Sequence, residues 1–152
     1  MKKTDFNLEL DYFPELLSLR STGLSQLKKW LWLSLREWPA VAESKLGGYA
    51  SVAVDEASQQ IIGEVLGKRF VLDFSFRACD TVSLIEVVLS MPCISSQARN
   101  EISRFLVAPS GEILSLDNET LLEIKDEGDD DHIRVSLLYA ILRKVMNHPV
   151  PF

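Results

Sequence analysis

Five carboxylates within six positions form the densest group of chemically active side chains in this sequence. A calcium loop of the EF-hand type needs carboxylates at alternating positions, a glycine at the sixth position and a glutamate at the twelfth. If Asp126 is the first position, Asp131 takes the place of the glycine and Leu137 that of the glutamate. The pattern therefore does not match, and no metal site is assigned. The five acids are Asp126, Glu127, Asp129, Asp130 and Asp131.

Two interpretations of this acidic run stay open. It leads into a helix expected over residues 131–146, and negative charge at the start of a helix complements the helix dipole. Alternatively, the run is a docking surface for a basic partner protein, because charges of one sign speed the encounter with a partner of the opposite sign. The second interpretation makes all five acids candidate partner-binding residues.

Other reactive residues do not form a recognisable catalytic or metal-binding pattern. His132 and His148 are too few for a histidine-based zinc site without help from carboxylates. Ser25 and Lys28 have the S-x-x-K spacing of some serine hydrolases, but none of the accompanying motifs follows. Cys79 and Cys93 lie near opposite ends of an expected strand, too far apart for a disulfide, which predicts thiols in a reducing compartment. No catalytic residue or cofactor is predicted.

Composition narrows the class of protein. A length of 152 residues, with 47% hydrophobic and 25% charged residues, predicts a single globular domain. The formal net charge of −6 disfavours nucleic acid as a partner, since proteins that coat nucleic acid are usually basic. No apolar run approaches the length of a membrane span. The first residues carry lysines without a following apolar segment, so we expect a cytoplasmic protein.

The strongest structural signal lies in residues 68–91. Phe70, Leu72, Phe74 and Phe76 occupy every second position, which predicts a strand with one apolar face. A second strand follows, apolar on nearly both faces and ended by Pro92. We therefore expect this hairpin inside an antiparallel sheet of about four to six strands.

Three helices are expected to pack mainly on one face of that sheet, which makes the fold α+β. Ser25 can cap the first helix, and Pro39 would end it. Asp55 and Gly67 would start and stop the second helix, although residues 60–66 also fit a strand. The three helices cover residues 25–38, 55–66 and 131–146.

Two shorter elements complete the prediction. A proline and a glycine at the second and fourth positions of residues 108–111 are typical of a type I turn. This turn predicts a second hairpin, built from residues 105–108 and 113–116. A short helix is expected over residues 119–124.

Trp32 has two possible roles. On the first helix, Lys28, Trp32 and Arg36 follow i, i+4 and i+8 spacing and share one face. A tryptophan between two cations could anchor a partner protein. A helix buried nearly all round would instead make it a core residue, which is the usual place of large aromatics and the favoured interpretation.

The function predicted from these observations is that of a non-enzymatic, cytoplasmic protein-binding module. It would block or escort a partner protein, in the manner of an immunity protein, an antitoxin or a small chaperone. One alternative is a small enzyme, a hydrolase or transferase, whose site is not visible in the sequence. Another is a self-associating structural subunit. The candidate partner-binding residues are Asp126, Glu127, Asp129, Asp130, Asp131 and Trp32.

Overall fold

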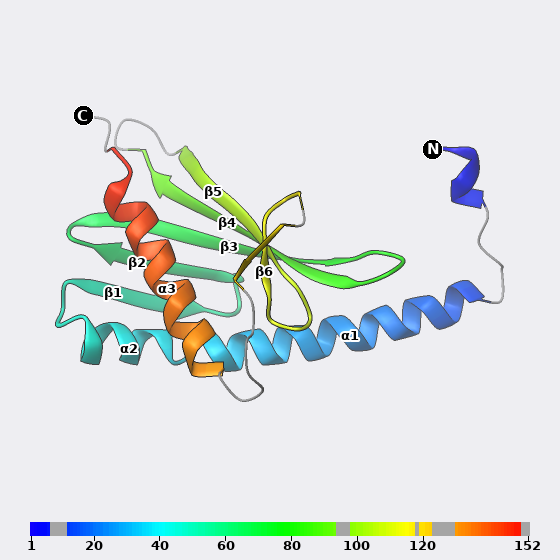
Figure 1. Ribbon diagram of the computed structural model, residues 1–152, viewed down its shortest axis with the longest axis horizontal. Helices are drawn as coiled ribbons and strands as arrows, with labels where there is room; N and C mark the ends of the chain where they lie inside the picture. Colours follow the sequence, from blue (N-terminus) through cyan, green and yellow to red (C-terminus); the bar gives the residue numbers. More distant parts are fainter. Residues whose placement is uncertain (7–11, 94–97, 118, 123–129, 150–152) are drawn as a thin grey trace.

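The computed structural model describes residues 1–6, 12–93, 98–117, 119–122 and 130–149, with the backbone alone for residues 130–133. Within these residues, seven strands form one antiparallel sheet whose spatial order follows the sequence (Figure 1). The predicted α+β class is confirmed, but the sheet has more strands than the four to six expected. The elements are η1 (Lys3–Phe6), α1 (Tyr12–Leu35), α2 (Trp38–Lys45), β1 (Ala50–Asp55), β2 (Gln60–Val65), β3 (Lys68–Ala78), β4 (Ser83–Pro92), β5 (Arg99–Val107), β6 (Ile113–Leu114), β7 (Thr120–Leu122) and α3 (Asp130–Asn147).

The predicted hairpin at residues 68–91 is confirmed as β3 and β4. β4 is the central strand of the seven and pairs with β3 and β5, in agreement with its apolar character on both faces. Phe70 and Leu72 of β3 are completely buried, and Ile85 and Val87 of β4 are at most 1% exposed. The alternating phenylalanines therefore face the core, as the period of two requires.

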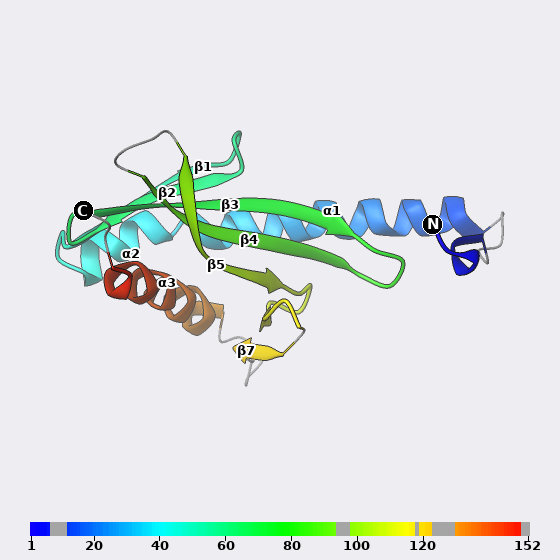
Figure 2. The same cartoon turned by 90° about the horizontal axis from the view of Figure 1, so that it is seen from above.

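The helices pack on the face of the sheet that these apolar side chains form. α1 contacts β3 and β4, α2 contacts β1, and α3 contacts β2 and β3 (Figures 1 and 2). Leu31, Trp38 and Val145, one from each helix, are all at most 3% exposed and belong to the same core cluster as the strand residues. The other face of the sheet, which we call the open face, carries the side chains that alternate with the core residues.

The helix predicted at residues 25–38 is wrong at both ends. α1 begins at Tyr12, so Ser25 lies inside it rather than at its cap, and Pro39 falls in the first turn of α2. Proline is tolerated in a first turn because the N–H groups there have no partner within the helix. The same reason explains why Pro14 lies in the first turn of α1.

The helix predicted at residues 55–66 is also wrong. These residues form the turn after β1 and strand β2, so the alternative interpretation of residues 60–66 as a strand is confirmed. Ile61 and Val65 are four positions apart, which places them on the same face both of a strand, with its period of two, and of a helix, with its period of 3.6. Gly63 between them leaves room for the ring of Phe70 on β3, because a Cβ atom there would lie 2.3 Å from that ring.

The second predicted hairpin is confirmed as β5 and β6. Gly111 N–H donates to the carbonyl of Ala108 at 2.9 Å, the hydrogen bond expected of a β-turn at these positions. The short helix expected from residue 119 is wrong, because Thr120–Leu122 form strand β7. Residues 123 and 124 of that prediction lie outside the described part of the chain.

The C-terminal helix agrees with the prediction to within one residue at each end. Lys68 caps its C-terminal end, because the Nζ atom donates to the carbonyl of Met146 in the last turn and to that of His148 just beyond the helix, both at 2.8 Å. A cation at this end complements the helix dipole and fixes α3 to the start of β3. None of the helices formed by the described residues has the length and apolar character needed to span a bilayer.

Candidate functional site

The predicted acidic site cannot be placed side chain by side chain. Asp126, Glu127 and Asp129 lie outside the described residues. Asp130 and Asp131 are the first two residues of helix α3. That acids in the first turn complement the positive end of the helix dipole stays a prediction. Their use as a docking surface stays a prediction as well.

Trp32 occupies the core rather than a partner-binding surface. Its side chain is 8% exposed, and its ring packs edge-on against Phe74 with the centroids 5.3 Å apart. The two cations that lie four residues before and after it on the helix contact other side chains. Lys28 Nζ lies 4.8 Å from the ring centroid of Phe76, and Arg36 pairs with Glu56. The favoured interpretation of Trp32 is thus confirmed, and little of its surface is left for a partner.

Exposed apolar side chains gather at the opposite end of α1. The N-terminal part of α1 and the tip of the β3–β4 hairpin extend side by side beyond the other strands, and the helix continues past the hairpin tip (Figures 1 and 2). We call residues 12–23 of α1 and residues 75–84 of the hairpin the arm. Arg20 Nη2 donates to the carbonyl of Asp80 at 3.0 Å, and Ser83 Oγ donates to the carbonyl of Arg20 at 3.5 Å. These contacts hold the helix and the hairpin together.

The arm covers its own apolar surface only along the centre. Leu16 is 4% exposed, but four neighbouring apolar side chains are between 46% and 60% exposed. A helix turns 100° per residue, so Leu19 lies on one flank of the line through Leu16 and Arg20 that faces the hairpin, and Phe13 and Leu17 lie on the other. Tyr12 continues that line toward the N-terminus. A ribbon of two strands is too narrow to cover both flanks. The four residues are Tyr12, Phe13, Leu17 and Leu19.

One flank of the arm opens into a groove of about 610 Å³. It runs between α1, the start of β4 and the turn that joins β5 to β6. Its lining includes the hydroxyl groups of Thr22 and Ser83, but no carboxylate or histidine that could act as a base beside them. The lining residues are Leu19, Arg20, Thr22, Gly23, Gln26, Leu27, Trp30, Val82, Ser83 and Pro109.

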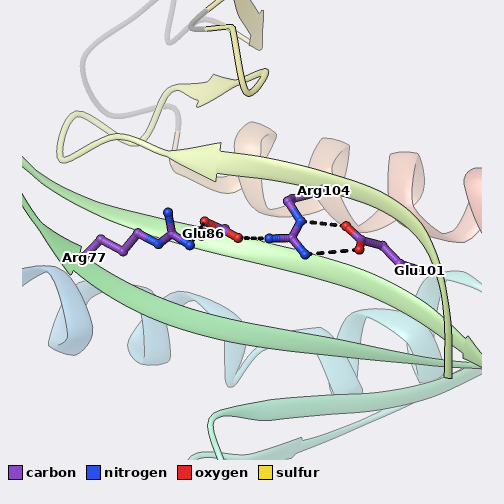
Figure 3. A network of polar contacts seen from close by, with 4 residues as sticks. All are labelled: Arg77, Glu86, Glu101 and Arg104. Atoms are coloured by element: carbon purple, nitrogen blue, oxygen red, sulfur yellow. Dashed lines mark hydrogen bonds and ion pairs between the residues drawn. The ribbon is translucent and has the colours of Figure 1, made fainter. Parts of the chain in front are cut away.

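The open face of the sheet carries a network of charged side chains (Figure 3). The carboxylate of Glu86 on β4 is 5% exposed and lies between Arg77 of β3, at 2.6 Å, and Nη1 of Arg104 of β5. Arg104 also donates through Nε and Nη2 to both oxygens of Glu101, at 2.6 and 3.1 Å. Asp73 on the same face accepts from Arg99 and Gln60, each at 2.7 Å.

This network is built for neutralisation rather than for proton transfer. The hydrogen bonds from Arg104 lower the pKa of Glu101, and they raise the pKa of Arg104 still further above its ordinary value. A catalytic acid or base needs the opposite arrangement, with a pKa moved toward neutrality. The network therefore fixes three strands to one another and covers the central strand.

The remaining reactive groups are dispersed. Cys79 is exposed in the hairpin turn, Cys93 follows β4, and the two do not form a disulfide, as predicted. Among the residues that the structure describes, no three histidine, cysteine or acidic side chains are grouped to hold a metal ion.

Comparisons with known proteins give no further guide. Neither the models of protein families, nor the curated proteins, nor the solved structures contain a match to this chain.

The exposed residues of the arm were missed by the prediction from sequence, although a signal for them exists. Phe13, Leu17, Leu24 and Leu31 continue the four- and seven-residue spacing of the core-facing side of α1 toward the N-terminus. Placing the helix start at Ser25 cut this pattern in two.

Proposed function

We propose that the protein is a non-enzymatic, cytoplasmic protein-binding module that blocks or escorts a partner protein through its arm. Immunity proteins, antitoxins and small chaperones act in this way. The observation that carries the proposal is the group of four apolar side chains, each about half exposed, that project from the arm. Large apolar side chains that are exposed close together on a protein surface are typical of an interaction site.

The shape of the arm supports the same function. A projecting helix with apolar flanks offers a partner a rigid surface, so that little conformational entropy is lost on binding. The half-buried Trp30 and Arg20 lie beside this surface. Both residue types are enriched among the side chains that dominate binding energy in protein interfaces.

A paired set of variants tests the proposal. Leu17 and Leu19 are replaced together by serine in the arm, and Leu33, which is 50% exposed on the same helix but outside the arm, is replaced by serine as a control. Tagged proteins are used to capture partners from the native cell, and the captured proteins are quantified by mass spectrometry. We expect the control to retain what the wild-type protein captures and the arm variant to lose it. Equal capture by all three proteins would rule out the arm as the binding surface.

The acidic run gives this proposal a second, electrostatic component. Replacement of Asp129, Asp130 and Asp131 by lysine should slow association with a basic partner, and more so at low salt, because long-range attraction is screened by ions. Association rates measured by surface plasmon resonance at two salt concentrations check this. Equal rates for wild-type and triple variant would remove the acidic run from the binding surface.

A further inference from the structure

Arg20 differs from most other arginines of the chain. Within the described residues, six arginines each have a carboxylate within 4.0 Å, namely Arg36, Arg69, Arg77, Arg99, Arg104 and Arg134. Arg20 has no such carboxylate there, and its Nε atom is buried without a hydrogen-bond partner. Its Nη2 atom donates to the carbonyl of Asp80, a neutral group. A half-buried guanidinium without an anion costs desolvation energy, so its presence calls for an explanation.

The position of Arg20 supplies that explanation. The side chain lines the 610 Å³ groove beside the arm, whose other walls are largely apolar. Leu19, which is 60% exposed, stands on one side, and Val82 and Pro109 form the other. Half-buried Trp30 lies further along α1 and packs on the core cluster. The groove thus combines a cation that has no carboxylate partner among the described residues with walls that are apolar except at Thr22, Gln26 and Ser83.

From these two observations we propose that the groove binds an apolar segment of a partner protein that carries a carboxylate, and that Arg20 binds this carboxylate. Arginine suits this role because its planar guanidinium can donate to both oxygens of a carboxylate. The assignment rests on the proposed function, since it names the chemistry of the partner segment that the arm would hold. It also separates this site from the acidic run, which would attract positive charge.

The test is a selection with a displayed library of random twelve-residue peptides on the purified wild-type protein. Enriched peptides are then measured by fluorescence anisotropy against Arg20→Gln and against Arg143→Gln. Arg143 is exposed on α3 and lies outside the groove, so its replacement changes the net charge equally without touching the site. Leu19→Ser serves as a second variant of the groove, and thermal unfolding shows whether each variant folds.

We expect enriched peptides to carry an aspartate or glutamate next to apolar residues. Binding should weaken by about tenfold or more in Arg20→Gln, the loss expected for a hydrogen bond between charged groups, and remain unchanged in Arg143→Gln. Replacing the peptide acid by its amide should cause the same loss on the wild-type protein and none on Arg20→Gln.

Three results would overturn the assignment: no enriched binder, enriched peptides without acids, or equal binding to wild-type protein and Arg20→Gln. Capture of a natural partner that depends on Leu17 and Leu19 but not on Arg20 would also overturn it. That last result would leave the proposed function intact.

Discussion

The two halves of α1 have similar apolar patterns but different surroundings. In the body of the protein, Leu27, Leu31 and Leu35 are at most 4% exposed beneath the sheet. In the arm, Leu17 and Leu19 are more than half exposed, because only the tip of one hairpin accompanies the helix there. The pattern of a helix thus determines which residues can be buried, whereas the width of the sheet above it determines which residues are buried.

The largest effect should come from the body. Leu31→Ala removes a side chain that is 3% exposed in the packed core, which should lower the free energy of unfolding by about 2–5 kcal/mol, as is usual for a buried leucine. Urea unfolding followed by circular dichroism measures the loss. A loss below about 1 kcal/mol would mean that the body is no better packed than the arm, and the comparison would fail.

A smaller effect is expected at Leu16, the one leucine of the arm's helix that is buried in the described structure. It is 4% exposed, but only the hairpin tip covers it, so the surroundings can relax into the space that Leu16→Ala would leave. The cost of such a cavity depends on how well the site can collapse, and we expect about 1–2 kcal/mol. A loss equal to that of Leu31→Ala, measured in the same urea experiment, would show that the arm is packed around Leu16 as tightly as the body is around Leu31.

How far the sequence predicts the fold can be judged from the same regions. Strict alternation in β3 and the apolar residues of β4 predicted the central hairpin correctly, since few other structures fit that pattern. The helix expected at residues 55–66 failed because Ile61 and Val65 fit both periods, and the packing of the Phe70 ring over Gly63 involves another strand. The secondary-structure propensity of a single residue carries no information on such contacts between strands.

The candidate site was predicted less well, for a similar reason. Trp32 was correctly favoured as a core residue. The arm was missed because Ser25 and Pro39 were interpreted as the two ends of one helix, while α1 continues through the first and ends before the second. Exposure of Leu17 also depends on where the sheet ends, and residue spacing within α1 carries no information on that.

At Leu17 the expected change in stability is smaller still. The side chain is 54% exposed, so Leu17→Ala should alter the free energy of unfolding by no more than about 0.5 kcal/mol. Because Leu16 and Leu17 are adjacent, the two alanine variants form a matched pair on one turn of the helix. A loss at Leu17 as large as that at Leu16 would indicate that another surface already covers it in solution, and sedimentation velocity would then show whether the protein self-associates.

The last contrast concerns the polar contacts that fix each end of α1. At the body end, Arg36 donates to both carboxylate oxygens of Glu56 in the β1–β2 turn, through Nε to Oε1 and through Nη2 to Oε2, the latter at 3.1 Å. These hydrogen bonds lower the pKa of Glu56. In the arm, Arg20 donates to a backbone carbonyl, which does not titrate in this range. A carboxyl group with a lowered pKa in the folded state stabilises the protein above its unfolded pKa, and this contribution disappears as pH falls through the folded pKa. The stability difference between wild-type protein and Glu56→Gln should therefore be present at pH 7 and vanish at acidic pH, whereas the difference for Arg20→Gln should not change. Urea unfolding from pH 7 to pH 3 measures both differences, and a constant difference for Glu56→Gln would exclude a charged pair at the body end of α1.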